Sequence, residues 1–204
     1  MTALMLLMPG TPMLFQGQEF WASTPFLYFA DHKPELAELV AKGRHEFVAQ
    51  FPSAASAPMR ERLANPKARE TFELCKLHWS ERERHAEVVA LHRDLLRLRR
   101  EDPVFAQQRR GALDGTLLGP EAFLLRFFGE GGQDRLLLVN LGRDLERRSI
   151  PDPLAAPPEG RGWRLIWSSE HPAYGGGGTP QIEAKERWRL PGHAAVVLAA
   201  TPAP

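Results

Sequence analysis

The sequence predicts an α+β chain in which a mainly helical first half is followed by an antiparallel β-sandwich. Three observations support this fold class. Residues 34–101 carry apolar side chains at helical spacing. After residue 103, short apolar or alternating runs are separated by turn-forming residues. Near the start, the apolar run Pro12 to Phe15 stops at polar residues, which is the pattern of a buried strand that ends at the edge of a binding site.

The opening run Ala3 to Met8 is expected to form the last turns of a buried helix, ended by Pro9-Gly10. A signal peptide is not expected, because no basic residue precedes the run and no small-residue cleavage site follows it. We therefore expect the chain to begin within a larger structure. The strand Pro12 to Phe15 supports the same expectation, because a buried parallel strand needs a hydrogen-bonded neighbour on each side.

Three helices are expected between residues 34 and 101. The first begins with Pro34, which suits the first helical position. The second follows Asn65-Pro66, a plausible cap and first-turn pair, and includes Cys75. The third starts after a capping box at Ser80 to Glu83 and ends at Asp102-Pro103. Its apolar positions recur at helical spacing, and its basic opposite side is expected to face water.

The second half contains turn-forming segments at the spacing of an antiparallel sandwich. One of them, Gly175 to Gly178, is expected to be a flexible loop, since no Lys-Ser or Lys-Thr of a phosphate-binding loop follows it. Another loop is expected at residues 52–58, and the boundary between the halves is placed near Asp102. The expected strands are Phe123 to Phe128, Arg135 to Leu141, Trp163 to Trp167 and Ala194 to Ala200.

Composition excludes several classes of partner. The chain has 204 residues, of which 43% are hydrophobic and 25% charged, and its net charge is +1. These values are typical of a globular domain and give no reason to expect nucleic acid or an anionic membrane as a partner. The single cysteine, Cys75, excludes an internal disulfide and fits a reducing, cytoplasmic compartment. His85 and His92 can share a helix face, but no further ligands lie nearby, so neither metal nor cofactor is expected.

The segment Gln18 to His32 combines aromatic rings with carboxylates and a histidine. Sugars present flat C–H faces for aromatic stacking and hydroxyl groups for polar side chains, so this mixture is typical of a carbohydrate cleft. The alternative is a hydrophobic loop packed on its own domain, with Glu19 in a structural role. A separation of twelve residues does not fix the distance that a catalytic pair of carboxylates requires. The candidate substrate-binding residues are Glu19, Trp21, Phe26, Tyr28, Phe29, Asp31 and His32.

Longer segments resemble a known family. PGTPMLFQGQEFWASTPFLYFADH, ETFELCKLHWSE, and WSSEHPAYGGGG with LPGHAAVVLAA are similar to the carboxy-terminal third of the malto-oligosyltrehalose trehalohydrolases, in the α-amylase superfamily of glycoside hydrolases. The resemblance implies that Pro12 to Phe15 is the eighth strand of a (β/α)8 barrel and that Gln16 to His32 is the loop at its carboxyl face. It implies a barrel portion over residues 1–103 and a C-terminal β-sandwich domain over residues 104–204.

The same resemblance implies a function. Enzymes of this family release trehalose by cleaving an α-1,4 bond, so the implied partners are an α-glucan or malto-oligosyltrehalose and an N-terminal barrel segment. The superfamily's catalytic acids follow the fourth, fifth and seventh strands, and the chain contains no Asn-His-Asp motif. We therefore expect no catalytic residue and an incomplete active site.

Two alternatives stay open at this point. One is a fragment of a glycogen branching enzyme or another α-amylase-family enzyme. The other is a stand-alone α-glucan-binding module, in which Trp163, Trp167 and Trp188 form either a sugar platform or part of the core.

Overall fold

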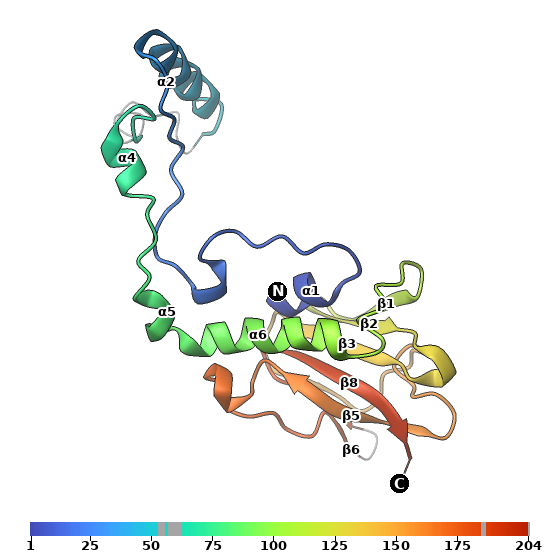
Figure 1. The fold of residues 1–204 in the computed structure, drawn as a ribbon. Coiled ribbons are helices and arrows are strands. Elements are labelled where there is room, and N and C mark those ends of the chain that lie inside the picture. The colour runs from blue at the N-terminus through green and yellow to red at the C-terminus, as the bar shows by residue number, and fades with distance from the viewer. Residues whose placement is uncertain (53–55, 57–62, 185–186, 204) are drawn as a thin grey trace. The chain divides into compact units, whose positions relative to one another are not determined.

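The computed structural model describes residues 1–52, 56, 63–184 and 187–203 (Figure 1). The chain divides into two compact units. The first, here the β unit, comprises Met1–Phe20 and His85–Pro204, and the second, here the helical unit, comprises Trp21–Arg84. The domain boundary predicted near Asp102 stays a prediction, because compact units need not coincide with the domains of a family.

The β unit contains two antiparallel sheets. The larger has the strand order β1-β2-β3-β8-β5 and the smaller the order β4-β7-β6. The strands are β1 (Leu113–Gly119), β2 (Ala122–Phe127), β3 (Arg135–Asn140), β4 (Leu145–Arg147), β5 (Arg161–Ser168), β6 (Glu183–Ala184), β7 (Arg187–Leu190) and β8 (Ala195–Pro202). The four predicted strands correspond to β2, β3, β5 and β8, so the antiparallel, sheet-rich part of the predicted fold is confirmed.

The helices of the β unit are α1 (Thr2–Leu7) and α6 (Ala86–Glu101), with 3-10 turns η1 (Gln18–Phe20), η2 (Glu130–Gly132) and η3 (Pro172–Tyr174). Side chains alternate between the two faces of a strand. Accordingly, Leu137 and Val197 of the large sheet pack with Leu95 of α6 and with α1. Leu136 and Val196, on the opposite face, pack with Trp188 of the small sheet. The large sheet is thus covered by helices on one face and by a second sheet on the other (Figure 1).

Helix α1 confirms the prediction that the opening apolar run is helical and buried, since Ala3, Leu6 and Leu7 are buried. Arg99 of α6 satisfies the carbonyl groups that α1 leaves without an intrahelical partner. Its guanidinium donates to the carbonyl oxygens of Leu6 at 2.6 Å and Met8 at 2.9 Å, and also to that of Gly10. Burial lowers the pKa of Arg99 from its usual value.

The strand predicted at Pro12 to Phe15 is absent, and this prediction is wrong for the structure described. These residues are irregular, and the side chains of Met13 and Phe15 are 86% and 53% exposed. A parallel strand is held by hydrogen bonds on both edges. Among the described residues, every strand of the large sheet begins after residue 112 and is already paired within that antiparallel sheet. Within the described part of the chain, residues 12–15 form no ladder with any of these strands.

The helical unit contains α2 (Pro34–Val48), α4 (Arg69–Glu73) and α5 (Glu81–Arg84). Pro34 occupies the start of α2, as predicted. The apolar stripe of α2 is largely exposed within the helical unit, because Leu39 is 67% and Phe47 is 53% accessible. The loop predicted at residues 52–58 lies mostly outside the described residues. No helix of the described residues is long and apolar enough to cross a membrane.

The third predicted helix is interrupted. The sequence predicts one helix after the capping box at Ser80 to Glu83, whereas the structure has α5 and α6 separated at His85. His85 has non-helical dihedral angles of −111° and 42°, and its Nδ1 lies 2.8 Å from the carbonyl oxygen of Phe20. The buried Glu81 bonds to Ser23. Contacts to residues distant in sequence thus end the helix where local pattern alone predicts continuation.

Candidate functional site

The aromatic segment after Phe20 lies extended along residues 65–81 within the helical unit (Figure 1). A ladder of side-chain and backbone hydrogen bonds holds it there. The amide and hydroxyl of Ser23 donate to the Glu81 carboxylate at 3.0 and 2.5 Å. The Leu27 amide donates to the Cys75 Sγ at 3.2 Å, and the Ala30 amide donates to the Pro66 carbonyl at 3.0 Å. The proline at position 25 favours an extended conformation at the residue before it.

Phe29 is the centre of the candidate site. Its ring packs edge-to-face on Phe72 of α4, with centroids 5.1 Å apart, and on Phe26 at 6.3 Å. Beside these rings lies a hollow of about 460 Å³ lined by Phe29, Phe72, Asp31 and the backbone turn at residues 66–69. This volume is within the range of about 300–1,000 Å³ of small-ligand sites. The arrangement places two aromatic rings next to a carboxylate.

Basic side chains border the hollow. Lys67 and Arg69 line it, and each has an exposed carboxylate partner: Lys67 Nζ lies 3.3 Å from Glu38, and Arg69 Nε lies 3.4 Å from Glu73. A hydrogen bond from Lys76, reinforced by Arg69, lowers the pKa of the Glu73 carboxyl. The hollow therefore offers both donors and acceptors around an aromatic floor.

The other predicted residues divide into two groups. Trp21, Phe26 and Tyr28 are 69%, 59% and 42% exposed, and the Arg44 guanidinium lies 5.6 Å from the centroid of the Tyr28 ring. Trp21 adopts a positive φ of 52°, an uncommon conformation for a large side chain. These residues belong to the same unit as the hollow but do not line it.

Asp31 and His32 are both exposed, and Asp31 alone of the two lines the hollow. Glu19 is half-buried in η1 and belongs to the β unit. The structure thus brings Phe29 and Asp31 together. The grouping of all seven predicted residues into one site stays a prediction.

Phe72, Lys67 and Arg69 were missed as site residues by sequence reasoning, because they lie about 40 residues after the aromatic segment. A signal was present in the chain, since Phe72 belongs to the segment ETFELCKLHWSE. That segment carries part of the family resemblance, although only a helix and no site residue was predicted for it. In the structure, Phe72 lines the hollow, whereas Cys75 and Glu81 accept hydrogen bonds from the extended segment.

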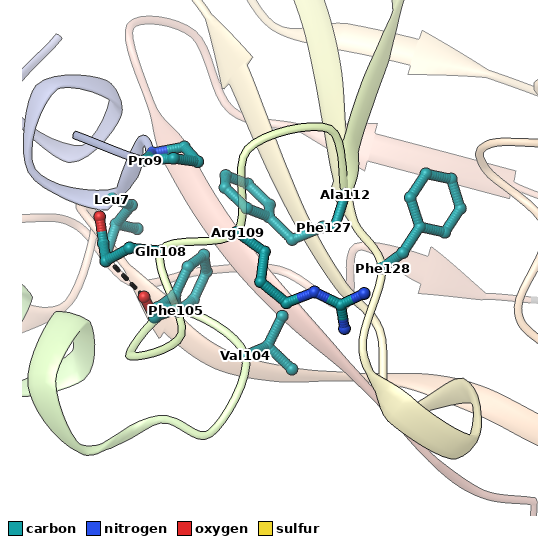
Figure 2. A pocket seen from close by; sticks show the side chains of 9 residues that line it. All are labelled: Leu7, Pro9, Val104, Phe105, Gln108, Arg109, Ala112, Phe127 and Phe128. Atoms are coloured by element: carbon teal, nitrogen blue, oxygen red, sulfur yellow. Dashed lines mark hydrogen bonds between the residues drawn. The ribbon is translucent and has the colours of Figure 1, made fainter.

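Two other features of the β unit are structural. A pocket beside α1, lined by Leu7, Phe105 and Phe127 among others, has a volume of only about 10 Å³ (Figure 2). That is room for about one water molecule. Trp167 and Trp188, considered above as a sugar platform, are each only 8% exposed and belong to the two cores. The platform is therefore wrong, and the core interpretation of these two residues is confirmed.

No group of three or more potential metal ligands occurs among the described residues. Cys75 is buried, and its thiol donates to the carbonyl of Thr71 at 3.1 Å. Its position indicates a structural role in holding the extended segment.

Comparison with known proteins agrees with this architecture. Residues 110–197 match a family described as a domain of unknown function (DUF3459), which is the C-terminal domain of α-amylase-family enzymes. Solved structures similar to the chain include trehalulose synthase MutB from Pseudomonas mesoacidophila MX-45, with a TM-score of 0.54 and 15% identity. Another is an isomaltulose synthase from Erwinia rhapontici NX5 in complex with sucrose, with a TM-score of 0.56 and 12% identity. In each case the likeness covers 98% of this chain and 37% of the other, and it concerns the fold alone. The chain is thus related to the glycoside hydrolases of the α-amylase family.

The curated relatives of the chain belong to one group of enzymes within this family. A malto-oligosyltrehalose trehalohydrolase from Deinococcus radiodurans is 45% identical over 141 residues, which is 68% of this chain and 22% of that protein. One from Arthrobacter ramosus is 44% identical over 110 residues, covering 52% of this chain and 18% of that protein. The resemblance to malto-oligosyltrehalose trehalohydrolases is therefore confirmed. The matched region spans about a fifth of the length of these relatives.

Proposed function

We propose that the chain forms part of a glycoside hydrolase that releases trehalose from malto-oligosyltrehalose by cleaving an α-1,4-glucosidic bond. The similarity to curated relatives with that name supports the specific reaction. On this proposal, the chain supplies saccharide contacts and a structural buttress, while the acids that perform hydrolysis lie in a barrel segment outside it. Retaining glycosidases need two carboxyl groups about 5 Å apart. Asp31 is the carboxylate in the hollow, and its neighbours there are basic or apolar.

The observation that carries the binding role is the hollow formed by Phe29, Phe72 and Asp31. Flat aromatic rings can stack on the C–H face of a glucosyl unit, and Asp31 with Lys67 or Arg69 can hydrogen-bond its hydroxyl groups. Trp21, Phe26, Tyr28 and His32 extend the same surface along the segment, and Glu19 would lie at its rim. We assign these residues to substrate subsites rather than to chemistry.

The proposed barrel partner accounts for two exposed apolar features. Met13 is exposed in a segment that has the pattern of a buried strand, and Leu39 is exposed on α2. Contiguous exposed apolar surface commonly marks an interface. In the proposal, residues 12–15 and α2 both pack against that barrel segment.

Titration of the whole ¹⁵N-labelled chain with maltoheptaose tests the binding role. The amides of residues 26–31 and 67–72 should shift on titration. Phe72→Ala should weaken binding about tenfold, which corresponds to the roughly 1–3 kcal/mol that an aromatic ring contributes by stacking on a ligand. Phe51→Ala is the matched control, because Phe51 is also half-exposed and in the same unit but packs on Phe47.

A parallel assay measures trehalose release from malto-oligosyltrehalose by the pure chain. We expect saccharide binding without turnover. Robust turnover would refute the assignment of chemistry to another segment. Absence of any shift near Phe29 and Phe72 at saturating sugar would refute the binding role.

A further inference from the structure

A second concave surface lies on the β unit. It is a groove of about 590 Å³ between the C-terminal half of α6 and the strand β5 with the turn η3. Asp94, Arg97 and Glu101 line it from the helix, and Arg164 and Tyr174 line it from the opposite side. The groove shares no residue with the hollow of the helical unit. Its volume is again that of a small-ligand site.

Tyr174 presents a fixed aromatic ring to this groove. Its hydroxyl donates to Asp94 Oδ2 at 2.6 Å, and the other oxygen of Asp94 accepts from Arg97. The Tyr174 ring is tilted against Trp167 at 6.1 Å and lies 5.6 Å from the His171 ring. A side chain held by a hydrogen bond at its hydroxyl and by neighbouring rings loses little freedom when a ligand binds against it, which favours binding.

The charges along the groove are balanced. Two of its three guanidinium groups have carboxylate partners: Arg97 with Asp94, and Arg135 with Asp102 at 2.8 Å. Arg164 and Glu101 are exposed and form no ion pair with another of the described residues, so they can hydrogen-bond a ligand. An equal number of positive and negative groups favours an uncharged ligand over an anion or a cation. The charged lining residues are Asp94, Arg97, Glu101, Asp102, Arg135 and Arg164.

We propose that this groove is a second saccharide site, which binds a short α-glucan on the β unit. A neutral ligand with one flat apolar face and many hydroxyl groups matches a rigid aromatic ring flanked by a carboxylate and a guanidinium. The saccharide class follows from the groove itself. The narrower assignment to α-glucans rests on the proposed function.

Site-resolved NMR of the full ¹⁵N-labelled chain tests the proposal. Maltotriose should shift the indole N–H of Trp167 and the amides of Gly175 to Gly178. Glu101→Ala and Arg164→Ala should each raise the Kd obtained from these shifts about tenfold or more, as expected for the loss of a hydrogen bond to a charged group. Arg148→Ala, which removes another exposed arginine of the β unit, should leave them unchanged. Because Glu101 and Arg164 are exposed, both variants should keep the wild-type spectrum elsewhere.

Three outcomes would overturn the proposal. Shifts confined to the helical unit would refute saccharide binding in the groove and leave the proposed function intact. Groove shifts that are stronger with glucose 6-phosphate than with maltotriose would show an anion site. Equal groove binding of maltotriose and cellotriose would refute the assignment to α-glucans, whatever happens at Phe29 and Phe72.

Discussion

Replacement of Arg126 by alanine should destabilise the β unit more than the removal of any surface ion pair. Arg126 is 8% exposed and lies on β2. Its Nε and Nη2 donate to Asp134 Oδ2 at 2.8 and 2.7 Å, and Asp134 is only 4% exposed. Its Nη1 donates to the carbonyl oxygens of Pro153 and Ala156 at 3.1 and 2.7 Å, and the guanidinium lies 5.6 Å from the Trp163 ring centroid.

The magnitude follows from what the substitution leaves behind. Arg126→Ala leaves the Asp134 carboxylate buried, with the Gly129 amide at 2.9 Å as its remaining described donor. Breaking one partner of a buried ion pair costs about 3–5 kcal/mol. The exposed pair of Arg189 and Glu146, 3.3 Å apart, provides the matched control, since such pairs contribute about 0–1 kcal/mol. Arg126→Ala should therefore lower the free energy of unfolding several-fold more than Arg189→Ala.

Hydrogen exchange in increasing urea, read by mass spectrometry on peptides from β3 and β8, measures the stability of this unit separately from the helical unit. The double variant Arg126→Ala/Asp134→Ala should recover part of the loss, because it removes the stranded charge. A loss below about 1 kcal/mol for Arg126→Ala, with a cooperative transition, would refute the reasoning.

Three further predictions concern other parts of the chain. Arg99→Ala should destabilise the β unit by about 1–3 kcal/mol, because it leaves carbonyl groups at the end of α1 without donors, whereas the exposed Arg100→Ala should have little effect in the same exchange experiment. Burial, and then the hydrogen bond to Asp94, raise the pKa of Tyr174 to about 12. The unfolded tyrosine ionises near 10, so stability should be complete below about pH 10 and fall between about pH 10 and 12; Tyr174→Phe should abolish that fall and the corresponding phenolate absorbance. Cys75 should react with a thiol reagent only as fast as the helical unit opens, and immediate reaction in the native chain would contradict its buried position.

The sequence pattern alone predicted a strand correctly where the residues that bury it belong to the same unit. The run Arg135 to Leu141 was predicted as a strand, and β3 occupies nearly the same residues because its side chains are buried on both faces. Strands β1, β4, β6 and β7 were missed. β1 contains Gly115 and Gly119 and is partly exposed, while β7 has only four residues. Short or glycine-containing strands form because of their neighbours, so their own sequence indicates them weakly.

The failures at Pro12 to Phe15 and at His85 have a common cause. In each case, contacts with residues distant in sequence, or the lack of them, decide the local structure. For the candidate site, the residue types of the aromatic segment predicted a carbohydrate-binding surface. In the structure, Phe29 and Asp31 line one hollow. The contribution of Phe72 requires that α4 pack beside a segment about 40 residues earlier, which no local pattern reveals.

A chimera tests the central proposal most directly. The 141-residue region of the Deinococcus radiodurans relative that matches this chain would be exchanged for the corresponding residues of this chain. The chimera should release trehalose from malto-oligosyltrehalose at a rate within about tenfold of the parent, a difference of about 1.4 kcal/mol in activation free energy, and Phe72→Ala should raise its KM. A folded chimera without trehalose release, or one indifferent to Phe72→Ala, would contradict the account.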